Sequence, residues 1–238
     1  MLRAFLDILF PPLCHICRTF IPAAGPLHIC AGCRESITTI SSPLCDLCGM
    51  PFGTIDGFDH RCGACSISPP RFDAARAATR FDGPVREMIH RFKYDQRVQL
   101  SRPLGLITAE TLAPWAAAIT SDLVVPVPLH VRRLRQRGFN QAVLIGQVLA
   151  HQWQLPLDRT GLRRIRWTEP QINLSAAERT ANVRGAFAVS APSRVEGRRV
   201  LLVDDVFTTG STVAECARAL KGAGATEVRV ATVARAVA

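Results

Sequence analysis

The sequence predicts an α/β fold, in which a parallel sheet flanked by helices follows a small cysteine-rich module. Eight of the nine cysteines lie before residue 66. After residue 70, apolar runs typical of buried strands alternate with helical patterns, and this alternation predicts a parallel sheet. The charge divides at the same place, because residues 1–70 carry four arginines and five acidic residues, a net of −1 out of a total of +10. We therefore expect a zinc module over residues 1–70 and a basic α/β domain over residues 71–238.

The first residues predict a short amphipathic helix. Apolar residues between Leu2 and Leu9 recur at helical spacing, and Pro11-Pro12 would end the helix. We expect this helix to dock on the protein core rather than on a membrane. No apolar run reaches the roughly 18 residues that span a bilayer, and no cleavage site of small residues follows. These features predict a cytoplasmic protein without a signal peptide.

The cysteines of the module form four C-x-x-C pairs, separated by twelve, eleven and thirteen residues. Each pair can direct both sulfurs at one ion, and two pairs supply the four thiolates that tetrahedral zinc prefers. The sequence therefore predicts two structural zinc ions. Because segments this small cannot build a sufficient apolar core, the metal should supply folding energy. The expected ligands are Cys14, Cys17, Cys30, Cys33, Cys45, Cys48, Cys62 and Cys65.

The spacing of the cysteines does not determine which two C-x-x-C pairs share one zinc ion. We expect the first pair to combine with the second and the third with the fourth, because this closes the shortest loops, but the spacing leaves an interleaved arrangement open. His15, His28 and His60 lie near the pairs and could replace a thiolate, although with eight thiols present we place them outside the ligand set. A disulfide framework would require an oxidising compartment, for which the sequence shows no secretion signal.

Strands and helices alternate along the second domain. Apolar runs predict strands at residues 123–127 and 198–203, and residues 74–80 and 227–233 are expected to form two further strands. Helices are predicted to begin at Asp82-Gly83-Pro84 and to cover residues 140–150 and 212–220. Gly222 and Gly224 mark the end of the last helix, and Cys216 within it is predicted to be a small core residue. In such parallel sheets, ligands bind at the carboxyl ends of the strands.

The most informative stretch is residues 200–212, VLLVDDVFTTGST. Four apolar residues predict a central strand, and Asp204 and Asp205 follow at its carboxyl end. A turn rich in hydroxyls and backbone N–H groups leads from there into a helix, whose N-terminus attracts anions. The turn therefore predicts a cradle for a phosphate monoester, although it lacks the G-x-x-x-x-G-K-[ST] pattern of nucleotide P-loops. A sugar phosphate with free hydroxyls, bound with Mg²⁺, would satisfy both the acidic pair and the turn.

Residues 200–212 closely resemble the phosphoribosyl-pyrophosphate (PRPP) motif of type I phosphoribosyltransferases. The resemblance implies that Asp204 and Asp205 hold the ribose 2′ and 3′ hydroxyls, and that residues 208–212 bind the 5′-phosphate. It also implies that Mg²⁺ accompanies the diphosphate. The PRPP-binding residues expected within this motif are Asp204, Asp205, Val206, Thr208, Thr209, Gly210, Ser211 and Thr212.

Residues 124–142, VVPVPLHVRRLRQRGFNQA, look like the pyrophosphate-loop region of the ComF family, whose members carry a zinc module before a phosphoribosyltransferase domain. On this resemblance we expect Val127 and Arg132 to bind PRPP as well. The expected catalytic residues are Asp204, Asp205 and Arg137. Further matches to the family pattern are Lys93-Tyr94, Gln171, Leu174, Arg179, Asn182 and Gly185-Ala186-Phe187. The resemblance covers nearly the whole chain, and it implies a part in natural competence and DNA uptake.

Arginines are concentrated in two segments near the PRPP motif, at residues 132–137 and 163–184. Residues 163–184 look like the mobile catalytic loop of such enzymes, which closes over a reactive diphosphate sugar and excludes water. The arginines in and around that loop are Arg163, Arg164, Arg166, Arg179 and Arg184. The densest basic run, made of Arg132, Arg133, Arg135 and Arg137, could contact pyrophosphate, the backbone of a nucleic acid or only solvent.

Two hypotheses about function follow from these features. In the first, the protein is a glycosyltransferase in which pyrophosphate leaves PRPP and a nitrogen nucleophile attacks C1, while arginines and Mg²⁺ neutralise the developing charge. In the second, the protein binds PRPP without turnover, as a sensor, and handles single-stranded DNA through its basic surface. The sequence carries no pattern that identifies the acceptor. Type I relatives often dimerise, so a homodimer is a further expectation.

Overall fold

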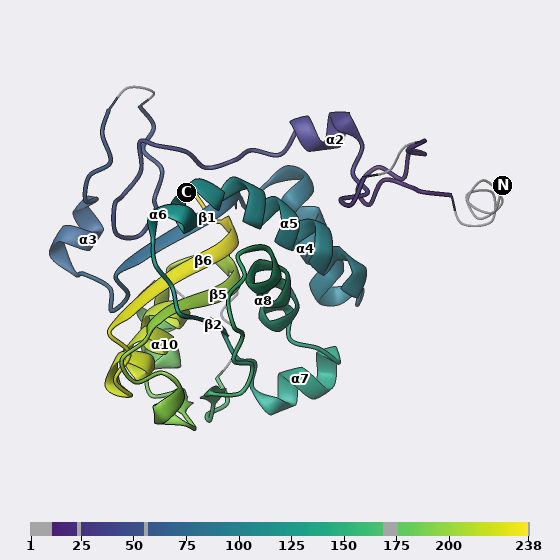
Figure 1. The fold of residues 1–238 in the computed structure, drawn as a ribbon. Helices are drawn as coiled ribbons and strands as arrows, with labels where there is room; N and C mark the ends of the chain where they lie inside the picture. The colour runs from purple at the N-terminus through teal and green to yellow at the C-terminus, as the bar shows by residue number, and fades with distance from the viewer. Residues whose placement is uncertain (1–10, 23–24, 55–56, 169–175, 238) are drawn as a thin grey trace.

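A computed structural model describes residues 11–22, 25–54, 57–168 and 176–237. Four strands form the central sheet in the order β1-β6-β5-β2, and all three pairings between neighbours are parallel. The strands are β1 (Ala74–Arg80), β2 (Leu123–Pro126), β5 (Arg199–Phe207) and β6 (Glu227–Arg235). The predicted parallel sheet is therefore confirmed (Figure 1).

The two central strands are longer than the sequence predicts. Strand β5 continues past Asp204 and Asp205 to Phe207, because its pairing with β6 continues through Val206 opposite Ala234 and Phe207 opposite Arg235. The acidic pair therefore lies within the last paired residues of strand β5 and not beyond its end. The sequence prediction ends the strand at the acidic pair because the apolar run stops there. The strand itself ends only where its backbone hydrogen bonds to β6 stop.

Three helices cover one face of the sheet: α4 (Gly83–Tyr94), α5 (Ser101–Thr111) and α8 (Gln141–Gln152). Their buried side chains, which include Met88, Leu104 and Ile145, pack on apolar residues of all four strands. Helices α5 and α8 approach closely, since a Cβ on Gly105 would lie 2.6 Å from the Cβ of Val148. Helix α5, the short helix α6 (Ala113–Ala118) and the 3₁₀ turn η1 (Val98–Leu100) have no counterpart in the sequence prediction.

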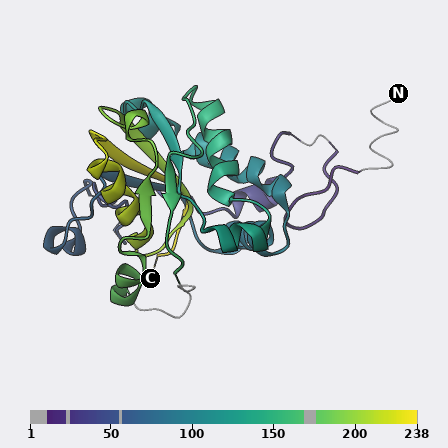
Figure 2. The ribbon, with the colours of Figure 1, turned by 90° about the horizontal axis from the view of Figure 1, so that it is seen from below.

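Helix α10 (Ser211–Gly222) covers the opposite face, as the views along and across the sheet agree (Figures 1 and 2). Beside it lies an antiparallel pair of short strands, β3 (Leu162–Arg164) and β4 (Phe187–Val189), followed by the 3₁₀ turn η3 (Pro192–Arg194). Cys216 of α10 is fully buried, so its prediction as a core residue is confirmed.

The segment 163–184, which resembles a mobile catalytic loop in the sequence, contains regular secondary structure in its described part. Strand β3 includes Arg163 and Arg164, which pair with β4, and helix α9 (Ala176–Val183) follows. Backbone pairing with β4 comes from a segment more than twenty residues away, so the local arginine-rich sequence does not reveal the strand. Gln171 and Leu174 lie outside the described residues.

The cysteine module wraps around the β1 edge of the sheet. Residues 38–40 run beside β1, where the Ile40 N–H donates to the Ala78 carbonyl at 3.0 Å and the Arg80 N–H donates to the Thr38 carbonyl at 2.9 Å. The module contains two one-turn helices, α2 (Ala31–Glu35) and α3 (Gly63–Ile67). Figure 1 shows α2 near α5, where the Arg34 guanidinium meets the Glu110 carboxylate at 2.6 Å.

The amphipathic helix expected before Pro11 lies outside the described residues. Within the part of the chain that the structure describes, no helix combines the length and the apolar character needed to cross a membrane.

Candidate functional site

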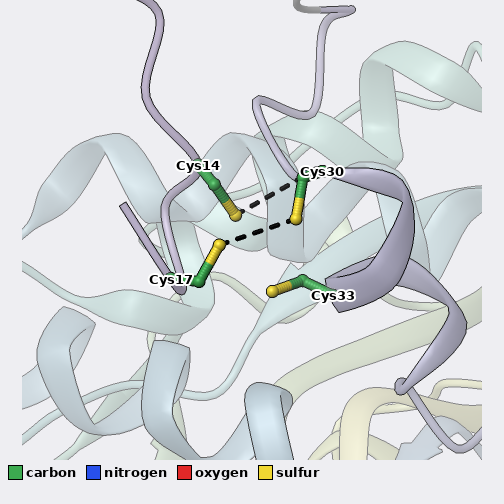
Figure 3. A group of neighbouring side chains, drawn as sticks. All are labelled: Cys14, Cys17, Cys30 and Cys33. Carbon is green, nitrogen blue, oxygen red and sulfur yellow. Dashed lines mark hydrogen bonds between the residues drawn. The ribbon is translucent and has the colours of Figure 1, made fainter. Parts of the chain in front are cut away.

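The eight cysteines of the module form two separate groups of four. In each group, the Sγ atoms all lie within 4.8 Å of one another. The first group contains Cys14, Cys17, Cys30 and Cys33, whose sulfurs converge in Figure 3, and the second contains Cys45, Cys48, Cys62 and Cys65. The predicted sequential pairing of C-x-x-C units is confirmed, and neither group includes His15, His28 or His60.

The geometry of both groups fits tetrahedral zinc. Four sulfurs at about 2.3 Å from a zinc ion lie about 3.8 Å from one another. The distance between the Cys17 and Cys30 sulfurs is 3.6 Å, and that between the Cys48 and Cys62 sulfurs is 3.8 Å. The backbone N–H groups of Cys48 and Cys62 both donate to the Cys45 sulfur at 3.4 Å. Burial alone would raise the pKa of Cys45, but these donors outweigh it and lower the pKa to about 6, which favours the thiolate.

The second cysteine group is part of the sheet domain's core, whereas the first lies at the surface of the helical layer. Cys45, Cys48 and Cys65 are buried and belong to the same apolar cluster as strand β5 and helix α10. Cys17 of the first group is exposed. Gly49, with φ of +69°, brings the second group against β1, since a Cβ there would lie 2.4 Å from the Ala75 carbonyl oxygen.

A cavity of about 640 Å³ opens at the carboxyl ends of β2 and β5. Its walls come from the end of α4, the turn after β2, helix α7 (Val131–Arg137), the start of α8, strand β3, helix α9 and the turn before α10. This is the edge of a parallel sheet at which ligands bind, and the volume is in the range of small-molecule sites.

The acidic pair lies on the wall of this cavity. Asp205 is almost fully buried, and its Oδ2 meets the Lys93 ammonium at 2.6 Å. The Asp205 N–H donates to Asp204 Oδ1 at 2.9 Å. Burial, together with the neighbouring negative charge of Asp205, raises the pKa of Asp204 to about 7. Two adjacent carboxylates, one of them paired with an ammonium, are suited to accept hydrogen bonds from ligand hydroxyls or to meet a cation.

The turn after β5 presents backbone N–H groups and hydroxyls beside the acidic pair. Gly210, the N-cap residue of α10, has φ of +78° and offers no side-chain cap, and the Ser211 N–H donates to the Thr209 hydroxyl at 3.5 Å. The hydroxyls of Thr209 and Thr180 each lie 2.9 Å from the Ser211 hydroxyl, so they form a short chain at that N-terminus. This arrangement is suited to an anion, because backbone amides, hydroxyls and the positive end of the helix dipole lie together at this N-terminus.

Basic side chains outnumber acidic ones around the cavity. Five basic side chains line it, against the two carboxylates of the acidic pair; they are Lys93, Arg133, Arg137, Arg164 and Arg179. The Arg137 guanidinium donates to Gln141 Oε1 at 2.8 Å and lies over the Tyr94 ring. Burial lowers the pKa of Arg137 from its usual value, and the charge of Asp205 opposes that shift. A cavity with this balance favours a ligand with several negative charges.

The structure brings most of the expected PRPP-binding residues together. Val127, Arg137, Asp204, Asp205, Val206, Thr208 and Thr212 line the cavity. Thr209, Gly210, Ser211 and Arg132 are not among its lining residues. The Arg132 guanidinium instead lies over the Trp167 ring, 5.8 Å from its centroid. Arg132 to Arg137 belong to helix α7, whose turns point successive arginines in different directions.

Sequence reasoning missed Lys93 and Arg133 as site residues. Lys93 appeared only as part of a family match, because nothing in residues 83–94 indicates that the end of that helix would meet Asp205. Arg133 lies in the basic run, but the sequence does not show that helix α7 directs Arg133 rather than Arg132 toward the cavity. Because the domain contains many arginines, the sequence did not distinguish the few that line the cavity from the others.

Comparisons with known proteins match both parts of the chain. Residues 5–66 match the family model of the double zinc ribbon domain, and residues 113–238 match that of the phosphoribosyl transferase domain. DNA utilization protein YhgH of Escherichia coli (strain K12) is 36% identical over 226 residues, which cover 92% of this chain and 95% of that protein. Competence protein F of Haemophilus influenzae is 34% identical over 227 residues, covering 91% and 96%. Competence protein ComFC of Bacillus subtilis (strain 168) is 26% identical over 200 residues, covering 81% and 77%.

The fold and the comparisons agree with one another. The structure has two groups of four cysteines and a parallel sheet whose acidic pair is followed by a hydroxyl-rich turn, and the relatives align over nearly their whole length. The chain belongs to the ComF family, in which a double zinc ribbon precedes a phosphoribosyltransferase domain.

Proposed function

We propose that the cavity binds PRPP together with Mg²⁺, and that the protein transfers the 5-phosphoribosyl group to a nitrogen nucleophile. The observation that carries this proposal is the position of Asp204 and Asp205 immediately beside the Gly210 turn, on the wall of a cavity in which basic side chains outnumber acidic ones. A ribose 5-phosphate unit needs hydroxyl acceptors and a phosphate cradle next to each other, and a diphosphate needs basic side chains.

Each part of the site has a role in this proposal. The carboxylates of Asp204 and Asp205 accept hydrogen bonds from the ribose hydroxyls, and the ion pair with Lys93 holds the Asp205 carboxylate in place. The N-terminus of α10 and the hydroxyls of residues 208–212 hold the 5′-phosphate. Arg137 and the other basic side chains of the cavity stabilise the charge that develops on the leaving pyrophosphate. Oxygen ligands are those that Mg²⁺ prefers, so the acidic pair fits it, and the ion would supply further charge neutralisation when bound.

Calorimetry with PRPP and MgCl₂ on zinc-replete protein tests the proposal. We expect binding by the wild type, and loss of binding in the variant Asp204→Asn with Asp205→Asn. The same variant should release no pyrophosphate when it is offered PRPP and a panel of nucleobases. Asp95→Asn is the control, because Asp95 is an exposed carboxylate near Lys93 that does not line the cavity. Unchanged PRPP binding in the double variant would refute the assignment.

The pH dependence of the same titration carries a signature of Asp204. Its pKa is raised to about 7, so the carboxylate gains a proton as the pH falls below that value. A protonated Asp204 cannot accept from a ribose hydroxyl with both oxygens, and PRPP affinity should rise between pH 6 and pH 8. The single variant Asp204→Asn should flatten that part of the profile, which separates the proton on the protein from protons on the ligand.

Single-stranded DNA binding is a second candidate function, favoured by a basic and aromatic cluster at the cavity wall. The guanidinium groups of Arg132 and Arg133 lie 5.8 and 6.0 Å from the centroid of the Trp167 ring, and the His130 ring meets it edge-on at 5.3 Å. Cations beside an aromatic face suit a strand that offers phosphates and bases together. The names of the relatives, DNA utilization protein and competence protein, agree with this candidate.

Fluorescence titration of a labelled oligonucleotide at several salt concentrations tests the second candidate. Replacement of Arg132, Arg133 and Arg135 by glutamine should weaken binding and reduce the slope of log affinity against log salt by about 2, at roughly 0.7 per phosphate contact. A charge-matched control replaces the exposed Arg71, Arg86 and Arg97, which lie elsewhere on the surface. Equal losses in both variants would point to net charge alone, and no binding at low salt would exclude this function.

A further inference from the structure

A buried arginine at the end of the last strand contacts the second cysteine group. Arg235 is 4% exposed, and its Nη1 donates to the carbonyl oxygen of Cys48 at 2.7 Å. Its Nη2 lies 3.8 Å from the Cys48 sulfur. Among the described residues, no carboxylate forms an ion pair with Arg235. A buried guanidinium requires a counter-charge, and a zinc ion with four thiolates, which carries a formal charge of about −2, would provide it.

The same guanidinium also contacts Phe207, at the base of the turn formed by residues 208–210, which we call the phosphate turn. It lies 4.3 Å from the centroid of the Phe207 ring, and Phe207 is opposite Arg235 in the pairing of β5 with β6. Phe207 is buried and directly precedes the turn. A Cβ on Gly210 would lie 2.5 Å from the Phe207 Cζ, so the ring supports the turn from below. Cys48, Arg235, Phe207 and Gly210 thus form one continuous chain of contacts.

We propose that Arg235 is a positioning residue through which the second zinc site and the phosphate turn stabilise each other. An occupied zinc site holds the guanidinium, the guanidinium holds the Phe207 ring, and the ring holds the Gly210 turn in its anion-binding form. Because coupling between two sites is reciprocal, a phosphoribosyl ligand in the turn should in return slow the loss of metal from the second site. This inference rests on the proposed function for its ligand, PRPP.

The first cysteine group provides a matched comparison within the same chain. There, Arg91 of α4 donates to the carbonyl oxygen of His15 at 2.8 Å, as Arg235 does to Cys48. The partner of Arg91 on the other side is the Glu87 carboxylate on the same helix, and neither residue lines the cavity. Metal retention at the first site should therefore be independent of PRPP.

Wild-type protein suffices for the first test. Zinc-replete protein is exposed to a chelator and an alkylating reagent, with and without saturating PRPP and MgCl₂, and peptide mass spectrometry follows each cysteine separately. PRPP should slow alkylation of the second group by about fivefold or more, a coupling of ordinary size, and leave the first group within about twofold. If calorimetry shows that PRPP binds, equal protection of both groups, or of neither, would overturn the coupling.

Variants supply a second test, whose main readout, hydrogen exchange, does not depend on PRPP. Arg235→Met removes the charge and the hydrogen bonds at similar length, and Arg91→Met does the same at the first site. Hydrogen exchange over residues 207–213 of the zinc-replete proteins should become at least about fivefold faster in Arg235→Met and stay unchanged in Arg91→Met. PRPP affinity should fall by a similar factor in the first variant only, with two zinc ions per chain retained.

The outcomes separate the two proposals. If the wild type gives no calorimetric signal with PRPP but the exchange of residues 207–213 still responds to Arg235→Met, the coupling stands and the proposed ligand is wrong. If PRPP binds but neither exchange nor metal retention responds, Arg235 has no positioning role. If neither measurement gives the expected result, both proposals fall.

Discussion

Replacing Cys45 by serine is expected to unfold most of the protein, whereas replacing Cys17 by serine should leave the sheet domain folded. Cys45 is fully buried in the cluster that includes strand β5 and helix α10, and Cys17 is exposed. A structural zinc site of this kind contributes about 10–16 kcal/mol in small domains. That is comparable with the entire stability of an average protein, about 5–15 kcal/mol. Losing the second metal site should therefore remove the β1 edge of the core.

Thermal unfolding followed by circular dichroism, with zinc measured per chain, checks this expectation. Cys17→Ser should retain about one zinc ion per chain and a cooperative transition, since its site is separate from the main core. Cys45→Ser should lose the cooperative transition or precipitate. The conclusion that the second site belongs to the sheet core would be wrong if both variants melted alike, with the same midpoint and one zinc ion each.

Replacing Gly210 by alanine should abolish most PRPP affinity and destabilise the protein. The residue has φ of +78°, a conformation that costs an ordinary L-residue about 1–2 kcal/mol. The new Cβ would also lie 2.5 Å from the Phe207 Cζ, and that ring is buried and held by Arg235. The turn must therefore shift, and a loss of about 1.4 kcal/mol in ligand binding already lowers affinity tenfold.

Gly222→Ala is the matched control for this variant, at the opposite end of the same helix. Its φ is not positive, and nothing lies within 4 Å of a Cβ there, so alanine should stabilise the helix slightly. Calorimetry with PRPP and thermal melts of both variants make the comparison, with about 2–4 °C in Tm for each kcal/mol at this chain length. A Gly210→Ala variant that binds PRPP as tightly as Gly222→Ala would show that the turn is not the phosphate site.

The position of the second zinc site suggests a structural reason for a zinc module beside a phosphoribosyltransferase domain: the site packs on the edge of the sheet. Its knuckle contacts strand β1 through the Ala75 N–H, which donates to the Leu47 carbonyl at 2.7 Å. The site thus completes the sheet edge, and through Arg235 it reaches the turn proposed to hold the phosphate. A division into units of residues 1–70 and 71–238 stays a prediction, although the two parts share one apolar cluster.

Much of the candidate site could be predicted because its parts are short and local. Two cysteines three positions apart can only point at a common ion if the backbone turns between them, and four such pairs indicate two ions. Asp204 and Asp205 are followed within a few residues by the hydroxyl-rich turn, so this combination is visible along the chain. The strands at residues 123–127 and 198–203 were predictable from their apolar runs, since buried parallel strands are apolar on both faces.

Other features depend on segments that the chain brings together from far apart. The sequential pairing of the cysteines was an expectation until the fold placed each pair beside its neighbour. Lys93 meets Asp205 only because α4 crosses the end of β5, and Arg235 meets Cys48 only because β6 lies beside the strand that the zinc knuckle covers. Such contacts are set by strand order and helix placement, which no local pattern records. The residues themselves therefore specify which chemistry is present, and long-range packing selects the side chains that share a site.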